Sequence, residues 1–119
     1  MGRLTLAFLA IFALSAAGSA MSDQGRKSYK APPVLMSKAQ KSVESKMKDP
    51  ASAQFRNVVA KGPNSDPKKW SICGEVNGKN AYGGYSGFTR FAYDESLNDS
   101  WIESEGAPDV MVRTLCGDT

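Results

Sequence analysis

The densest group of residues suited to making specific contacts lies between Cys73 and Phe91. This stretch contains five glycines and four aromatic side chains. Aromatic rings can stack on a sugar or a base, and amide and ammonium groups can donate hydrogen bonds to it. The segment is therefore a candidate binding surface, formed by Asn77, Lys79, Asn80, Tyr82, Tyr85, Phe88 and Arg90.

The same composition also suits a tight hairpin with a purely structural role. Asn77-Gly78 and Gly83-Gly84 favour turns because glycine readily adopts a positive φ. The aromatic rings would then fill the core of a small sheet. The residues alone leave both interpretations open.

Groups that could catalyse a reaction are scarce. The chain has no histidine, which is the commonest general base and metal ligand at neutral pH. A hydrolase would have to use acidic residues such as Glu103 and Glu105, which lie on one face of a predicted strand. We therefore expect a non-catalytic protein with no cofactor and no bound metal.

The only two cysteines are Cys73 and Cys116. In an exported protein such a pair is read first as one disulfide. Closing the loop between Cys73 and Cys116 stabilises a fold by about 4 kcal/mol in the chain-entropy model. We predict a single Cys73–Cys116 disulfide.

The first twenty residues have the three regions of a cleavable signal peptide. Arg3 is followed by the apolar run Leu4–Leu14, which is too short to span a bilayer, and then by the small residues Gly18-Ser19-Ala20. Cleavage is expected before Met21. No later stretch is apolar enough to span a membrane, so we expect an exported protein of the periplasm or the extracellular space.

Charge divides the remaining chain into two unequal halves. Residues 21–70 carry eleven Lys/Arg and four Asp/Glu, whereas residues 71–119 carry three Lys/Arg and eight Asp/Glu. A basic half can bind a polyanion, or it can attract the acidic half of the same chain. The sequence favours attraction between the halves, because dispersed lysines on a helix usually form a solvated face.

Residues 21–33 are polar and rich in turn-forming residues, which predicts a disordered lead. From Pro33 onward a four-residue apolar repeat predicts a helix, and this repeat consists of Leu35, Ala39, Val43 and Met47. Strands are expected at residues 55–60, 70–76, 85–93 and 101–105, with a final helical turn at residues 109–115. Residues 34–119 thus form a single α+β domain: a small antiparallel sheet of three to four strands with one covering N-terminal helix and one disulfide.

Two sequence patterns together carry a resemblance. The first is Asp49-Pro50-x-Ser52-Ala53-x-Phe55, and the second begins Cys73-Gly74-Glu75-Val76-Asn77-x-Lys79-Asn80 and continues through Gly83-Gly84-Tyr85-x-Gly87-Phe88 to Phe91. The combination resembles small exported bacterial proteins of unassigned function. The resemblance implies a bacterial, periplasmic setting and brings no catalytic residues with it.

These observations lead to one expected function and two alternatives. We expect a binding module that acts through a macromolecular partner, such as an envelope protein, in an inhibitor-like or immunity-like role. The first alternative is a polyanion- or glycan-binding domain that uses the loop from Lys79 to Tyr85 and the helix lysines Lys38, Lys41, Lys46 and Lys48. The second is a hydrolase that uses acidic residues.

Overall fold

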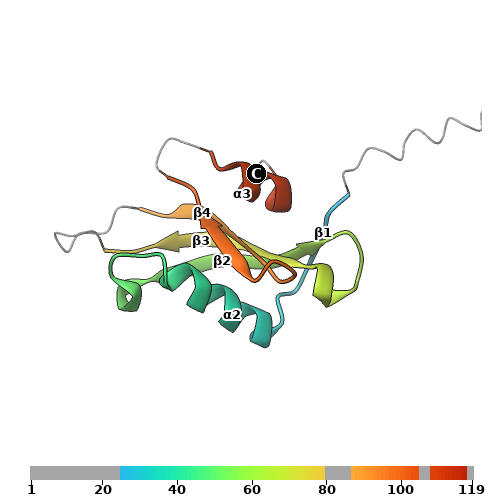
Figure 1. The fold of residues 1–119 in the computed structure, drawn as a ribbon, viewed down its shortest axis with the longest axis horizontal. Helices are drawn as coiled ribbons and strands as arrows, with labels where there is room; N and C mark the ends of the chain where they lie inside the picture. Colours follow the sequence, from blue (N-terminus) through green and yellow to red (C-terminus); the bar gives the residue numbers. More distant parts are fainter. Residues whose placement is uncertain (1–24, 80–86, 105–107, 118–119) are drawn as a thin grey trace, which may run out of the picture.

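The computed structural model describes residues 25–79, 87–104 and 108–117. Its centre is one antiparallel sheet with strand order β1-β2-β3-β4-β5. The strands are β1 (Lys27–Tyr29), β2 (Gln54–Gly62), β3 (Ser71–Asn77), β4 (Thr89–Asp94) and β5 (Asp99–Ile102). Helices α2 (Pro33–Glu44) and α3 (Val110–Cys116) lie on opposite faces of this sheet (Figure 1). Two short 3-10 turns, Pro50–Ser52 and Pro67–Lys69, precede β2 and β3.

The α+β class and the antiparallel sheet are confirmed, but the expected number of elements is wrong. The sheet has five strands rather than three to four, and the helical turn expected at residues 109–115 is a second helix, α3. The additional strand is β1, which falls inside the predicted disordered lead. Lys27, Ser28 and Tyr29 pair with the end of β2 instead, so the ordered domain begins before residue 34.

Helix α2 covers one face of the sheet with the apolar repeat that the sequence predicted. Leu35, Ala39 and Val43 are buried along its length. They pack on a cluster from β3 and β4 that consists of Ile72, Val76, Phe91 and Tyr93. Each fully buried side chain of this kind stabilises a fold by about 1.5–3 kcal/mol, so this interface is the main core.

Helix α2 ends earlier than the apolar repeat suggests. The repeat extends to Met47, but the helix stops at Glu44 and Ser45 forms its C-cap. The Ser45 hydroxyl donates a hydrogen bond back to the carbonyl of Ser42 at 2.6 Å. Serine competes in this way with the helical hydrogen bonds of the backbone. Met47 therefore lies in the turn after the helix.

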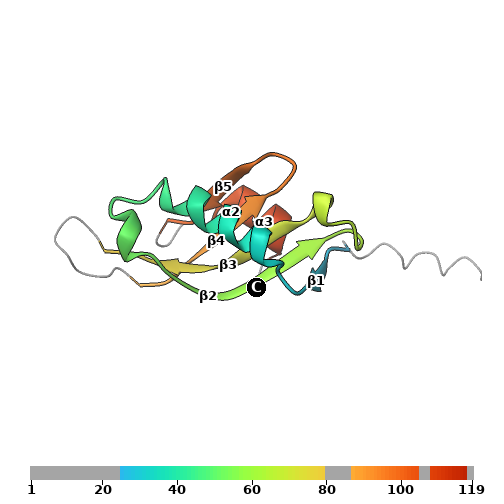
Figure 2. The same ribbon diagram turned by 90° about the horizontal axis from the view of Figure 1, so that it is seen from below.

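A second row of α2 residues holds the β4–β5 hairpin beside the helix (Figure 2). Lys38 forms an ion pair with Glu95 at 3.0 Å, and the Ser42 hydroxyl donates to Ser100 at 2.7 Å. The ammonium of Lys46, beyond the end of α2, reaches Asp99 at 2.9 Å. Lys38, Ser42 and Lys46 are four residues apart, so they lie on one side of the chain, next to the residues of α2 that face the core. The edge strand β5 is thereby held against the helix.

Strand β1 is held by contacts with residues far away in the sequence. The ring of Tyr29 stacks on Trp70 with centroids 4.6 Å apart. The guanidinium of Arg26 donates to Ser71 Oγ at 2.8 Å, and this hydroxyl donates to the buried carboxylate of Asp94. These contacts order a segment whose own sequence has no strand pattern.

Candidate functional site

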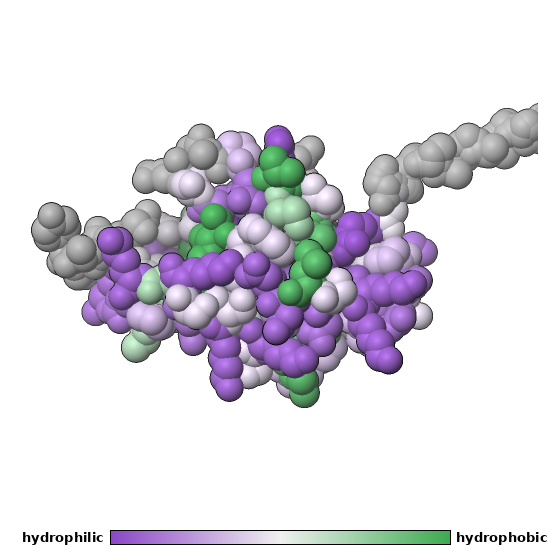
Figure 3. Space-filling view, in the orientation of Figure 1, coloured by the Kyte–Doolittle hydropathy of each residue, from purple (hydrophilic) through white to green (hydrophobic). Residues whose placement is uncertain are grey.

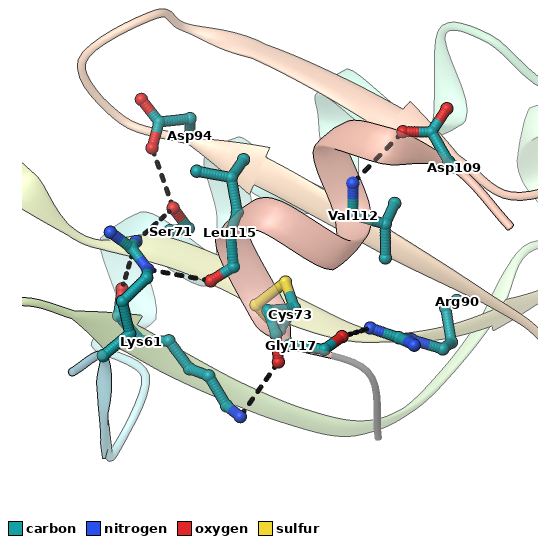
Figure 4. Close-up of a disulfide and its surroundings, with 11 residues drawn as sticks. Lys61, Ser71, Cys73, Arg90, Asp94, Asp109, Val112, Leu115 and Gly117 are labelled. Atoms are coloured by element: carbon teal, nitrogen blue, oxygen red, sulfur yellow. Dashed lines mark hydrogen bonds between the residues drawn. A yellow bond between two sulfur atoms is a disulfide. The ribbon is translucent and has the colours of Figure 1, made fainter. Parts of the chain in front are cut away.

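The disulfide joins the sheet to α3 as predicted. Cys73 lies on β3 and Cys116 at the end of α3, with 5.9 Å between their Cα atoms. Both are buried in a second cluster with Ala92, Val112 and Leu115. No free cysteine is found in the residues that the structure describes. The bond (Figure 4) fixes the short α3 over the face of the sheet opposite α2 (Figure 1).

Three cationic side chains donate hydrogen bonds to the last carbonyls of α3. Each serves one carbonyl: Arg26 donates to Leu115, Lys61 to Cys116 and Arg90 to Gly117. Helix C-termini carry a partial negative charge, so cations there are favourable. Arg90 was predicted to belong to a binding surface. Its guanidinium helps to hold the end of α3 (Figure 4).

A shallow groove of about 310 Å³ lies beside the disulfide, and we call it the disulfide-side groove. Its lining includes Asn57, Val59, Lys61, Glu75, Arg90 and Cys116. The register of β2 shifts between Arg56 and Val59, and Asn57 adopts a φ of 55° there. Asparagine tolerates this left-handed conformation better than most residues. The bulge brings the Asn57 amide to the Glu75 carboxylate at 2.9 Å.

Several polar groups of the disulfide-side groove are bonded within the fold. Arg56 donates to Glu75 at 2.8 Å, beside the bond from Asn57. These two hydrogen bonds lower the pKa of the Glu75 carboxyl below its ordinary value of 4.5, and the bond from Arg56 has the larger effect. Lys61 and Arg90 donate to carbonyls at the end of α3. The charged side chains that line this groove, Lys61, Glu75 and Arg90, are therefore hydrogen-bonded to other parts of the fold.

Of the predicted binding surface, the structure describes Asn77, Lys79, Phe88 and Arg90. The Asn77 amide oxygen accepts a hydrogen bond from Gly87 at 3.0 Å and closes the base of the β3–β4 hairpin. The ring of Phe88 lies against the Arg56 guanidinium, 3.8 Å from its carbon to the ring centroid. Lys79 lies on a different groove from Arg90. Asn80, Tyr82 and Tyr85 lie outside the described residues.

The groove that contains Lys79 is at the end of the sheet, and we call it the hairpin-end groove. Its volume is about 530 Å³, within the range of ligand sites in proteins. Apolar side chains from three parts of the chain form its floor, and lysines stand at its rim. The lining is Lys46, Met47, Lys48, Val76, Gly78, Lys79, Gly87, Thr89, Ile102 and Ser104.

Met47 and Gly78 meet at the centre of the hairpin-end groove. A Cβ atom on Gly78 would lie 2.1 Å from the Met47 methyl carbon, so only glycine leaves the thioether its present position. Methionine is flexible and polarisable and adapts to irregular apolar surfaces. The sequence pattern assigned Met47 to the helix–sheet core, and nothing in it placed this residue opposite Gly78.

The hairpin-end groove is locally apolar on a largely polar molecule. The face in Figure 3 is mostly hydrophilic, and its hydrophobic residues form a few separate patches. The largest exposed apolar side chains in the described residues are Val34, Leu97 and Val110. None of these three lines the hairpin-end groove, so the groove is distinct from the scattered exposed residues.

Part of the uneven charge of the chain is paired within the domain. The three ion pairs in the described residues are Lys38–Glu95, Lys46–Asp99 and Arg56–Glu75. Each joins a cation from the basic half to a carboxylate from the acidic half, as the sequence favoured. Two of the four lysines assigned to a polyanion-binding helix are therefore paired with carboxylates.

Of the two acidic residues considered for hydrolysis, the structure describes Glu103. A Glu103 carboxylate oxygen accepts from the backbone N–H of Asp109 at 3.2 Å, next to the start of α3. Glu105 lies outside the described residues. In the parts of the chain that the structure describes, no group of three or more His, Cys, Asp or Glu side chains is placed to hold a metal ion.

No helix among the described residues is long and apolar enough to cross a membrane. Comparison of the chain with protein-family models, with curated proteins and with solved structures finds no match. The case for a function therefore rests on the chemistry of the molecule itself.

Proposed function

We propose that this chain is an exported, non-catalytic module that binds a macromolecular partner in the periplasm or outside the cell. The hairpin-end groove is its contact surface. The observation that carries the proposal is the combination of an apolar floor, from Met47, Val76 and Ile102, with Lys48, which is exposed and forms no ion pair with any residue that the structure describes. Such a groove offers burial for an apolar group and pairing for charged ones.

Export is supported by the signal-like first twenty residues and is compatible with the disulfide. Structural disulfides persist in oxidising compartments and are rare in the cytosol. A non-catalytic role is supported by the absence of histidine from the chain and by the pairing of both cysteines. An envelope protein remains the expected partner.

The test is affinity capture from periplasmic extract with the exported chain and two charge variants. Lys48→Glu reverses a charge at the rim of the groove, where the side chain is exposed. Lys68→Glu makes the same change on the 3-10 turn before β3, at the opposite end of that strand. The proposal predicts a captured protein that Lys48→Glu loses and Lys68→Glu retains. Equal capture by both variants contradicts it.

Ionic strength separates this function from the polyanion- or glycan-binding alternative. Binding to a polyanion weakens steeply with salt because counterions are released on association. A partner that also buries apolar surface retains part of its affinity at high salt. Capture that disappears entirely at high salt, and that an added polyanion competes away at low salt, would favour the alternative.

A further inference from the structure

We infer that helix α3 stays docked on the sheet when the bond between Cys73 and Cys116 is reduced. Three cations, Arg26, Lys61 and Arg90, hold the last carbonyls of this helix, and we call them the cationic clamp. The clamp sets the position of Cys116, and the disulfide secures a helix that is already in place. Helix α3 lies on the face of the sheet opposite α2 (Figure 1), so the inference goes beyond the proposed function and does not depend on it.

Helix α3 needs support from the rest of the domain. It has 7 residues, and isolated helices shorter than about 12–15 residues are marginal in water. Its start is capped, because the Asp109 carboxylate accepts from the backbone N–H groups of Met111 and Val112. The last carbonyls of a helix have no partner within it, and they carry a partial negative charge. Contacts that hold α3 on the sheet therefore have to satisfy this end.

The cationic clamp supplies one charged donor for each of the successive carbonyls of residues 115–117. The bonds from Arg26 and Lys61 are 2.9 and 3.1 Å long and partly buried, and the bond from Arg90 lies at the surface (Figure 4). Hydrogen bonds from charged donors are stronger than those between neutral groups. The clamp is therefore matched to the charge and to the unpaired acceptors of the helix end.

The sheet positions the clamp without the disulfide. Lys61 lies on β2 opposite Ser71, and Arg90 lies on β4 opposite Glu75. The guanidinium of Arg26 also donates to the Ser71 hydroxyl at 2.8 Å. The main core that supports these strands is the cluster under α2, which is separate from the cluster that contains α3. The three donors therefore keep their places whether the bond is open or closed.

Apolar packing adds to the clamp. Val112 is completely buried, and Leu115 is buried in the same cluster as Ala92 of β4. This packing removes apolar surface from water and requires no covalent bond. The Cα atoms of Cys73 and Cys116 are 5.9 Å apart, which is within the usual range for a disulfide. The clamp and the packing therefore keep the two thiols close together through contacts that involve no sulfur.

The experiment measures amide hydrogen exchange by mass spectrometry on the exported chain, with and without reductant. A synthetic peptide of residues 108–117 gives the exchange rate of the same sequence without the sheet. We expect the α3 amides of the reduced chain to exchange at least about tenfold more slowly than those of the peptide. Exchange as fast as in the peptide overturns the inference, whether α3 alone has detached or the whole domain has unfolded. This comparison needs no change to the protein.

Variants of the clamp show which contacts hold α3. Lys61→Gln and Arg90→Gln each remove one charged donor, whereas the control Arg113→Gln removes an exposed charge on α3 that donates to none of the three carbonyls. In the reduced chain, each clamp variant should speed α3 exchange about tenfold, and the control should leave it nearly unchanged. Protected β3 amides in the same samples show that a variant is folded. Equal α3 exchange in folded clamp and control variants would mean that the clamp does not hold the helix.

Discussion

The hydroxyl of Ser42 on α2 lies 2.7 Å from the hydroxyl of Ser100 on β5, and Ser100 is completely buried. This single hydrogen bond joins the covering helix to the edge strand of the sheet. Its neighbours on the same side, Lys38–Glu95 and Lys46–Asp99, are partly exposed ion pairs. Exposed pairs contribute little, so the buried serine pair is the stronger part of this junction.

Replacing Ser42 with alanine should lower the free energy of unfolding by about 1–3 kcal/mol, because the Ser100 hydroxyl loses a partner in a buried position. Removing both hydroxyls should cost less than the sum of the two single changes. Urea unfolding of the two single variants and the double variant measures this coupling. Strictly additive losses would mean that the two hydroxyls do not depend on each other.

Gly62 occupies a position at which a side chain does not fit. A Cβ atom there would lie 2.4 Å from the Trp70 ring, which is stacked on Tyr29 and donates to the carbonyl of Asn64 at 2.8 Å. Because the indole cannot move without losing these contacts, Gly62→Ala should destabilise the fold by about 1–3 kcal/mol. Thermal unfolding checks this value.

Gly78→Ala is the control for Gly62. Its Cβ would be even closer to a neighbour, at 2.1 Å, but that neighbour is the terminal methyl of the flexible Met47. The methionine can rotate away, so the loss of stability should be smaller than for Gly62→Ala. If Gly78→Ala proved the more damaging of the two, Met47 would have to be far more tightly held than its exposure suggests.

The Cys73–Cys116 bond closes a loop of 43 positions in the sequence. Replacing both cysteines with alanine should lower the free energy of unfolding by about 4 kcal/mol in the chain-entropy model. Reduction of the unaltered protein should give a loss of similar size, measured by urea unfolding with and without reductant. A loss below about 1 kcal/mol would indicate that the unfolded chain gains little freedom when this bond is cut.

Acid should weaken the fold through Glu75. The hydrogen bonds from Arg56 and Asn57 lower the pKa of this carboxyl below 4.5. A lowered pKa means that the ionised form stabilises the folded state above about pH 4.5, and that this contribution is lost as the pH falls through the lowered pKa. Glu75→Gln should therefore flatten the acid side of a plot of stability against pH. An unchanged acid slope would assign the loss to other carboxyls.

The core-facing side of the fold was predictable because its signals are local. The repeat of Leu35, Ala39 and Val43 fixes one face of α2, and the alternation around Cys73 places this residue opposite Ile72 on the other side of β3. The disulfide followed from having only two cysteines. Strand β1 was missed because its order depends on the stacking of Tyr29 on Trp70, which no local pattern reveals.

The candidate site was less predictable than the fold. The sequence singled out residues 77–90, and four of these, Gly78, Lys79, Gly87 and Thr89, line the hairpin-end groove. The rest of the lining comes from the turn after α2, from β3 and from the end of β5 and the residues after it. The sequence identified Lys79 as a candidate binding residue. It assigned Met47 to the apolar repeat of the helix and Ile102 to a predicted strand, and it gave neither of them a binding role. Grooves of this kind arise where distant segments meet, and a single sequence does not show which segments meet.

The position of Cys116 sets the order in which the protein can mature. This cysteine follows all five strands along the chain. Cys73 therefore has to wait as a free thiol until the final helix has been made and delivered, and in the proposed route of export it crosses the membrane unpaired. Oxidation then acts on a sheet whose strands are already present. The covalent bond can therefore form only after every strand of the sheet has been synthesised.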